Sequence, residues 1–454
     1  MKPVRVRAGW IVAAVALFAL AIASVFFLDA SVHPVCHDAR AYWRIAGVYA
    51  EDGILAAHHA ANMRTWAYPA LLMLVLRLSE ALALEAGPVL FVLQFIAHLG
   101  SCALLAARVF VARRRPALLL FALLACNPFV LPYVGVSLTD GAALACFNVW
   151  LAAVVSGARP GRYRWAWIAL AGAMAGAACA IRPAYVYLLL LTPLVALVGG
   201  RRLRERLVAV VLALVMPFLA LGPQVAINHL HFDRATPLPV GNLGAGQVIW
   251  GITNLKYGTS PVPDDDPRMF YPNPLAGGTG EVEGLGWYLR HPARGAGTLA
   301  LKLVGAFDFD FLPAYVWDRE PPLQWLFRLL SLGLLVAGLS GMWLYARSTP
   351  PAQAAWLGPR WMPAVVFAAW AAVTLPSAVE LRFTLPMLPL MLALAVVAGV
   401  RLHDDRWRPS RRVLALPALA FVAMALAAGF VGRQNVIFDP TPADPDTIAL
   451  YECR

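Results

Sequence analysis

The residues from Trp10 to Leu28 form an unbroken apolar block of 19 residues without a charged side chain. A helix rises about 1.5 Å per residue, so this block can cross a hydrocarbon layer about 30 Å thick. Similar blocks recur along the 454-residue chain, which is 61% hydrophobic and only 14% charged. So little charge could not cover the surface of a soluble domain of this size. The sequence therefore predicts an all-α polytopic membrane protein.

The first apolar block also resembles a signal peptide, because Lys2, Arg5 and Arg7 precede it. However, its apolar core is long for a signal peptide, and the exit at Leu28-Asp29-Ala30 is a poor cleavage site. We interpret the block as a retained first helix.

The net charge is +12, and the distribution of the basic residues is typical of membrane topology and not of a nucleic-acid-binding surface. Twenty basic residues fall in six short segments that contain only three acidic residues. The segments are Lys2 to Arg7, Arg113 to Arg115, Arg159 to Arg164, Arg201 to Arg206, Arg347 to Arg360, and Arg401 to Arg412. Short loops rich in Lys and Arg mark the cytoplasmic side. Arginine and alanine are abundant and lysine is scarce, as in GC-rich bacterial genomes, so we expect a bacterial inner membrane.

Placing these six segments in the cytoplasm gives eleven spans, with the N-terminus cytoplasmic and the C-terminus on the outer side. The expected spans are 10–28, 86–111, 116–134, 138–157, 165–181, 183–199, 207–226, 323–345, 361–376, 382–400 and 413–431. This defines a transmembrane domain, 1–431, with outer loops 29–85 and 227–322, and a short polar outer tail, 432–454. The aromatic residues of loop 227–322 argue against disorder.

Residues 67–84 are apolar enough to span, but counting them would move Arg113 to Arg115 to the outer side. We expect a re-entrant or interfacial helix within the first outer loop. The alternative is a true span here with a compensating change elsewhere, for twelve or thirteen in all.

Asp38 follows the first span on the outer side. The apolar and aromatic positions Tyr42, Ile45, Ala46 and Tyr49 then recur at helical spacing, which predicts an amphipathic helix beginning at Asp38. The simple interpretation is a helix-capping aspartate. The functional one is a general base that the helix N-terminus keeps ionised.

Asp140 opens the span 138–157, with Thr139 or Ser137 as the expected cap. Alone it is an ordinary first-turn acid. The charge-derived topology, however, places Asp140 at the same outer mouth as Asp38, and an acid at membrane depth is by default a functional candidate. We therefore take Asp38 and Asp140 as the candidate catalytic pair.

Several basic residues lie on the outer side against the topology rule: Arg64, Arg182, Lys256, Arg290 and Arg382. Each is explained either by pairing with an acid, as Glu380 could pair with Arg382, or by binding a phosphate group.

Other polar clusters give weaker signals. His33, His37, His58 and His59 could bind a divalent cation with Asp38, but their spacing matches no known metal site. Residues 264–266 are three aspartates between prolines and fit a solvated turn best. Cys36 and Cys453 are the two cysteines in outer polar segments, and a disulfide between them is an option in an oxidising compartment.

The order of short motifs resembles the GT-C superfamily of membrane glycosyltransferases, which includes protein O-mannosyltransferases and lipid A aminoarabinose transferases. The motifs are Asp38 with Tyr42-Trp43, Tyr68-Pro69, Asn127-Pro128, Thr139-Asp140, Arg182-Pro183 and Glu380-Leu381-Arg382-Phe383. The resemblance extends to about residue 400, but no Lys-Pro or His-Pro-Pro signature lies near Tyr68, which leaves the subfamily and the acceptor open.

The resemblance implies a sugar donor on polyprenyl phosphate and catalysis at the outer mouth, with a cell-envelope glycan, lipid or protein as acceptor. It identifies Asp38 and Asp140 as the catalytic acids. The expected substrate-binding residues are Tyr42, Arg64, Tyr68, Arg182, Lys256, Glu380 and Arg382. No metal ligands are assigned, and a divalent cation remains open as a cofactor.

Two other classes compete with a transferase. A lipid transporter or flippase would place charged residues near mid-span and contain two related halves. A non-catalytic membrane scaffold would not require acidic residues to gather at one end of the helix bundle. The concentration of acids and aromatic residues at the outer mouth favours the enzyme.

Overall fold

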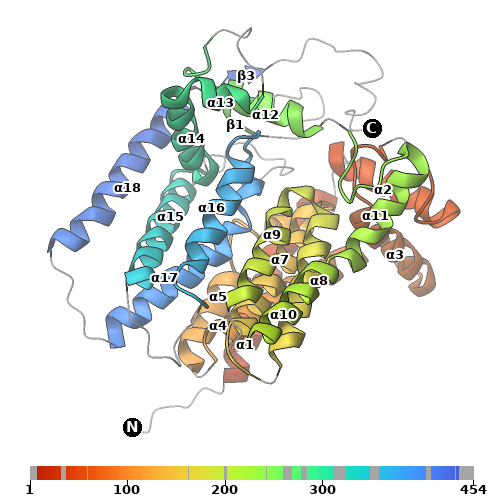
Figure 1. Ribbon diagram of the computed structural model, residues 1–454, viewed down its shortest axis with the longest axis horizontal. Coiled ribbons are helices and arrows are strands. Elements are labelled where there is room, and N and C mark those ends of the chain that lie inside the picture. Colours follow the sequence, from red (N-terminus) through yellow and green to blue (C-terminus); the bar gives the residue numbers. More distant parts are fainter. Residues whose placement is uncertain are drawn as a thin grey trace.

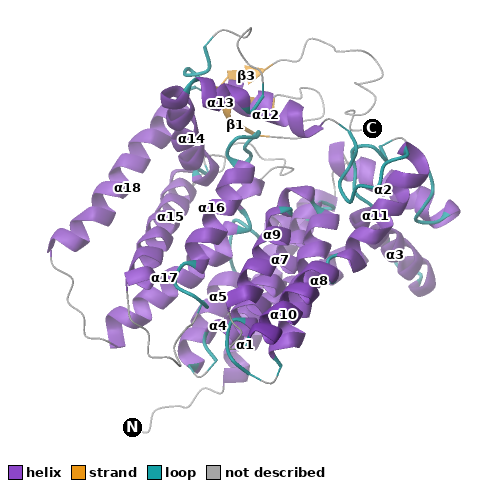
Figure 2. Ribbon diagram, in the orientation of Figure 1, coloured by secondary structure: helices purple, strands orange, loops and turns teal. Residues whose placement is uncertain are grey.

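The computed structural model is a bundle of long helices with a smaller cap of short helices and strands at one end (Figure 1). It describes residues 8–31, 37–58, 60–111, 113–161, 163–198, 202–241, 243–258, 268–277, 284–309, 324–347, 357–404, 411–434 and 436–438. Helices make up most of this part of the chain (Figure 2), as the apolar blocks predicted.

The first half of the chain contains eleven α-helices within the described residues. They are α1 (Ala8–Ser31), α2 (His37–Asp52), α3 (Ala67–Leu82), α4 (Ala86–Val109), α5 (Arg114–Ala125), α6 (Pro132–Gly135), α7 (Thr139–Gly157), α8 (Arg164–Ile181), α9 (Tyr187–Val198), α10 (Leu203–Val215) and α11 (Phe218–Phe232). A 3-10 turn, η1 (Pro183–Tyr185), leads into α9.

The second half begins with the cap and returns to the bundle. The cap consists of α12 (Leu243–Thr253), β1 (Asn254–Gly258), β2 (Arg268–Pro272), α13 (Gly286–Arg290), α14 (Pro292–Phe307) and β3 (Val436–Phe438). The bundle helices are α15 (Gln324–Arg347), α16 (Met362–Thr374), α17 (Met387–Asp404) and α18 (Arg411–Gly432), and the 3-10 turn η3 (Leu381–Thr384) precedes α17.

Six helices of the described residues are long and apolar enough to cross a membrane, namely α1, α4, α7, α8, α15 and residues 415–432 of α18. The bent pair α10 and α11, which meet at 41°, would make a seventh. The eleven expected spans each overlap a helix, but α5, α9 and α16 are too short for a full crossing, and α17 is not among the six helices that qualify. The length and composition of the helices therefore show a multi-span helical membrane protein, with the number of spans unconfirmed.

Local chemistry explains where the shorter and bent helices stop. The expected span 116–134 ends early because α5 stops before Asn127-Pro128, and a proline disfavours helix at the residue before it. The bend between α10 and α11 lies at Pro217, against α8. A Cβ on Gly176 would come within 2.4 Å of the Pro217 carbonyl oxygen, so only glycine allows this backbone contact.

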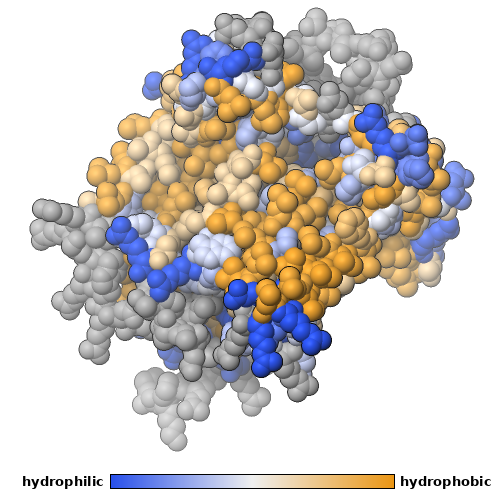
Figure 3. All heavy atoms as spheres, viewed as in Figure 1, coloured by the Kyte–Doolittle hydropathy of each residue, from blue (hydrophilic) through white to orange (hydrophobic). Residues whose placement is uncertain are grey.

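The surface shows the division expected for a membrane protein. Apolar side chains cover the flank of the long helices, and polar side chains gather at the two ends (Figure 3). The interior is packed mainly by α4, α7, α8, α15 and α17, where Trp150 is fully buried and its indole N–H donates to the Thr192 hydroxyl at 2.9 Å.

Helix α3 lies beside α2, to one side of the bundle (Figure 1). Its inner face buries Tyr68 and Leu72, and Leu74, Leu78 and Leu82 form an exposed apolar stripe on the other side. At 16 residues it is too short to be among the six long helices. An interfacial or re-entrant helix remains our prediction for this segment.

Loop 227–322, predicted to lie on the outer side, contains all of the cap except β3. Strands β1, β2 and β3 form an antiparallel sheet in that order, with Tyr257 opposite Phe270 and Met269 opposite Ile437. The short strands lack a clear alternating pattern, which is why the sequence did not reveal them. Because β3 belongs to this sheet, residues 436–438 lie at the same end of the bundle as residues 254–258 and 268–272.

Some expectations fall outside the described residues. They are the Cys36–Cys453 disulfide, the aspartates 264–266, and the side chains of His33, His37 and His59.

The topology makes a direct prediction. Reporter fusions after residues 114, 162, 204 and 408 should report a cytoplasmic location, because each lies within a basic segment. Fusions within 240–290 and at the C-terminus should report the outer side. Paired alkaline phosphatase and green fluorescent protein fusions would measure this, and a cytoplasmic C-terminus would contradict the orientation.

Candidate functional site

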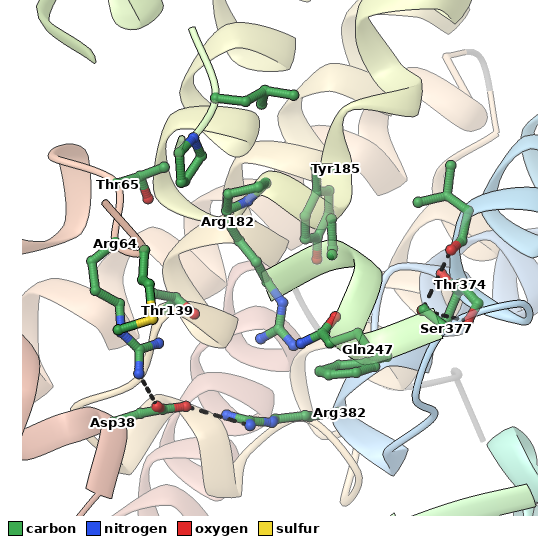
Figure 4. A pocket seen from close by; sticks show the side chains of 18 of the residues that line it. Asp38, Arg64, Thr65, Thr139, Arg182, Tyr185, Gln247, Thr374, Ser377 and Arg382 are labelled. Carbon is green, nitrogen blue, oxygen red and sulfur yellow. Dashed lines mark hydrogen bonds and ion pairs between the residues drawn. The ribbon is translucent and has the colours of Figure 1, made fainter. Parts of the chain in front are cut away.

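A cavity of about 540 Å³ opens where the cap meets the bundle. Three parts of the chain form its wall: the start of α2 with the loop after it, the segment from α7 to α9, and α12 with residues 370–386. Figure 4 shows that Asp38, Arg64, Arg182 and Arg382 converge on one side of this cavity. Residues more than 300 positions apart in sequence thus share one pocket.

Asp38 lies in the first turn of α2, which begins one residue earlier at His37. The predicted amphipathic face is confirmed, because Tyr42, Ile45, Ala46 and Tyr49 are all buried. This packing holds the first turn of α2 at the cavity rim.

The Asp38 carboxylate is held between two guanidinium groups. It pairs with Arg64, and its Oδ2 lies 3.5 Å from Nη2 of Arg382 (Figure 4). Burial by itself would raise the pKa of Asp38, but the charges of Arg64 and Arg382 outweigh it and hold the pKa below its ordinary value. The carboxylate is therefore ionised.

Asp140 lies in the first turn of α7 and is almost completely buried. It forms an ion pair with Arg182, and its Oδ2 lies 3.8 Å from Nη1 of Arg382. The expected cap is corrected: Leu138 occupies the N-cap position and no side chain caps the helix. The acid at the helix start is instead stabilised by arginines and by the helix dipole.

Arg382 connects the two aspartates. Its Nε donates to Glu380 at 2.5 Å, and its two Nη atoms face Asp38 and Asp140. Glu380 is fully buried and Arg382 is 9% exposed. The Glu380–Arg382 pair expected from the sequence exists, and it also orients a guanidinium at the cavity wall.

Positive charges outnumber negative charges on the wall of the cavity. Arg64, Arg182, Arg382 and Asp38 are the charged residues in its lining, while Asp140 and Glu380 lie behind the arginines. Three guanidinium groups and one carboxylate therefore face the space. Such a wall attracts an anion, and guanidinium groups match the oxygens of a phosphate.

Two tyrosines support the Asp38 side of the cavity. Tyr42 lines it and accepts a hydrogen bond from Arg64 at 3.3 Å. Tyr68 packs edge-on against Tyr42 at 5.1 Å between ring centroids and is fully buried behind it. Tyr68 is thus one layer behind the cavity.

Lys256 lies away from the cavity lining. Its Nζ is buried and contacts Asp308, with 3.0 Å to the main-chain carbonyl oxygen and 3.4 Å to Oδ2. Arg328 also binds the Asp308 carboxylate, at 2.7 Å. The structure therefore places this predicted substrate-binding residue in an ion-pair cluster between the cap and α15.

Sequence reasoning missed several lining residues: Tyr185, Tyr187, Gln247, Tyr257, Trp370, Thr374 and Ser377. Tyr185 and Tyr187 closely follow the Arg182-Pro183 motif, which could have drawn attention to them. Gln247 carries no such signal, since it is an isolated amide in a Gly-rich segment.

The carboxylates do not fit a divalent-cation site as arranged. Each of Asp38, Asp140 and Glu380 is paired with an arginine, and a dication between them would face three guanidinium groups. Within the described ranges, no three His, Cys, Asp or Glu residues converge as metal ligands.

The Asp38 pairing predicts acid sensitivity. Its folded-state pKa is below the ordinary value, so the stability it contributes is present above the unfolded pKa and lost as pH falls towards the folded value. We expect the melting temperature of the wild type to exceed that of Asp38→Asn at pH 7, and the gap to narrow below about pH 4. Thermal unfolding in detergent at several pH values would measure it. Asp52→Asn, exposed at the end of the same helix, should show no such gap, and a gap between the wild type and Asp38→Asn that is as large at pH 3 as at pH 7 would contradict the pairing.

No protein-family model matches this chain, and no curated protein matches it in sequence. Its fold is similar to solved structures of the oligosaccharyltransferase AglB from the archaeon Archaeoglobus fulgidus. A complex with an inhibitory peptide and a dolichol-phosphate is 12% identical with a TM-score of 0.42, covering 93% of this chain and 56% of that one. A complex with Zn and sulfate is also 12% identical, with a TM-score of 0.45, covering 95% and 54%. This chain thus spans about half the length of those proteins.

Proposed function

We propose that this protein is an inverting glycosyltransferase that moves a sugar from a polyprenyl-phosphate donor to a cell-envelope acceptor at the outer face of the membrane. The observation that carries the proposal is the cavity wall of three arginines around one ionised aspartate. The apolar helices α9 and α16 contribute Tyr187 and Val373 to the lining, so the prenyl chain of a donor could lie along them.

The arginines suit the leaving group. The C–O bond between the anomeric carbon and the donor phosphate breaks, and the phosphate oxygen keeps both electrons of this bond, so negative charge develops on the phosphate. Arg182 and Arg382 would stabilise this charge, as charge-assisted hydrogen bonds are the strong ones. Asp140 and Glu380 hold the two guanidinium groups in place from behind.

Asp38 suits the role of general base. The acceptor hydroxyl attacks the anomeric carbon on the face opposite the phosphate, and its proton passes to the Asp38 carboxylate. A single displacement of this kind inverts the anomeric centre.

Donor binding would also activate this base. With Arg64 and Arg382 against it, Asp38 has a lowered pKa and is therefore a weaker base than an ordinary aspartate. A phosphate that draws Arg382 towards itself removes one of these positive partners. The pKa of Asp38 then rises towards its ordinary range, so base strength increases when the donor is in place.

The decisive experiment incubates the purified protein with a panel of polyprenyl-phosphate sugars and measures release or transfer of the sugar. A transferase consumes the donor and leaves polyprenyl phosphate, whereas a flippase moves the donor intact across a vesicle membrane. Turnover of one donor by the wild type and its loss in Asp38→Asn would support the proposal. Intact translocation without cleavage would reject it in favour of the transporter class.

A further inference from the structure

Helix α12 and residues 376–378 meet backbone to backbone beside the cavity. A Cβ on Gly251 would lie 2.3 Å from the carbonyl carbon of Ser377 and 2.6 Å from the carbonyl oxygen of Pro376, so glycine is needed for this approach. The Ala378 N–H donates to the Gln247 carbonyl oxygen at 2.7 Å. These two segments supply Gln247, Val248 and Ser377 to the cavity lining.

A buried lysine joins the two segments from behind. Lys302, on α14, is fully buried, and its Nζ donates to the carbonyl oxygen of Gly251 at 2.6 Å and to that of Ser377 at 2.5 Å. In the described part of the chain, no carboxylate lies within ion-pair distance of this amine.

Such a placement is costly. Lysine is seldom fully buried without an acid, and its burial here lowers the pKa to about 7. The charged and the neutral amine can both donate to the two carbonyl groups, so the bridge does not depend on the charge. A simple apolar residue would fill this core position at lower cost but would leave one buried and one partly buried carbonyl oxygen without this donor.

We propose that Lys302 is a positioning residue that holds α12 against residues 376–378 and thereby fixes the wall of the cavity. Figure 4 shows Gln247 from this wall close to Arg182, and Thr374 and Ser377 along the same side. The adjoining chain leads through Glu380 to Arg382, so movement of residues 376–378 also reaches the arginine between the two aspartates. The placement of the wall stands on geometry, while its effect on ligand binding rests on the proposed function.

Hydrogen–deuterium exchange tests the placement without an assay of activity. Lys302→Met keeps the length of the side chain and removes its donors, so exchange in 245–253 and 374–382 should rise about tenfold or more. Lys256→Met is the matched control, because it removes another buried lysine of the cap that does not contact this wall. Equal exchange in Lys302→Met and the wild type would overturn the proposal.

A second pair of variants works without the lysine. Gly251→Ala forces α12 away from Ser377, whereas Gly246→Ala on the same helix meets open space, with no atom within 4 Å. We expect the exchange pattern of Lys302→Met in Gly251→Ala and the wild-type pattern in Gly246→Ala. If Lys302→Met does not fold, this pair still decides whether the contact fixes the wall.

Binding of farnesyl phosphate, followed by tryptophan fluorescence, adds a readout that general destabilisation would not produce. Affinity should fall about tenfold in Lys302→Met and Gly251→Ala, and stay unchanged in Lys256→Met and Gly246→Ala. Raised exchange without any binding of farnesyl phosphate by the wild type would uphold the positioning role and count against the lipid-phosphate donor. Equal affinity in all variants despite raised exchange would overturn the link between the wall and the ligand.

Discussion

Asp38→Asn is expected to lower turnover by about two to four orders of magnitude, the usual contribution of a general base. The amide is nearly the same size and cannot accept the acceptor proton. It also loses the ionic contacts with Arg64 and Arg382, so a modest loss of stability accompanies the catalytic defect. Initial rates with the donor found in the panel, together with thermal unfolding, would measure both effects.

The same position separates catalysis from helix capping. A capping role predicts that Asp38→Ala unfolds more easily and that Asp38→Asn has almost full activity, since asparagine caps well. A catalytic role predicts that both variants fold and both are nearly inactive. Donor binding should survive in Asp38→Asn, because the arginines remain. Full transferase activity in purified Asp38→Asn would reject the central assignment of the site.

Arg382→Ala is expected to have the largest combined effect on stability and ligand binding. The guanidinium contacts Asp38, Asp140 and Glu380, and Glu380 is fully buried. Removing one partner of a buried ion pair typically costs about 3–5 kcal/mol. The cavity also loses a charge-assisted donor to phosphate, so donor affinity should fall about 10- to 100-fold. Thermal unfolding and a binding titration would record the two losses separately.

A double variant distinguishes the two losses. Glu380→Gln combined with Arg382→Ala removes the buried charge and should recover much of the stability without restoring donor affinity. Arg77→Ala is the matched control, because Arg77 and Glu80 form an exposed pair 3.6 Å apart on α3. It should change stability by less than about 1 kcal/mol. If the double variant recovers binding as well, Arg382 does not contact the donor.

Local sequence patterns predicted part of the candidate site. Helical spacing after Asp38 predicted the buried face of α2, and the sidedness of basic segments placed Asp38, Asp140, Arg182 and Arg382 at one mouth before their contacts were known. The helical spacing and the sidedness of the basic segments can both be read from the sequence without knowing how the helices pack. They did not predict that Arg382 lies between the two aspartates, since that depends on how η3 packs against α2 and α7.

Lys256 and Lys302 show the opposite case. Both lie in loop 227–322, which is predicted to be outer, and a cation on that side suggested a phosphate ligand for Lys256. In the structure, the Lys256 amine donates to Asp308, and the Lys302 amine donates to two backbone carbonyl groups beside the cavity. Nothing in the sequence around either lysine encodes these partners, because they lie more than 50 residues away.

The sequence by itself determined that this chain is a helical membrane protein, which of its ends carries the acids, and which face of α2 is buried. The helical class and the buried face follow from hydropathy and period, which act over a few residues or across a whole span, while the membrane side of the acids stays a prediction from charge. Only the tertiary structure decided the lengths of the broken helices, the small sheet of the cap, the pairing of each arginine with its acid, and the wall held by Lys302. Those features arise from close packing between distant segments, where a single glycine or carbonyl oxygen determines which backbones can meet.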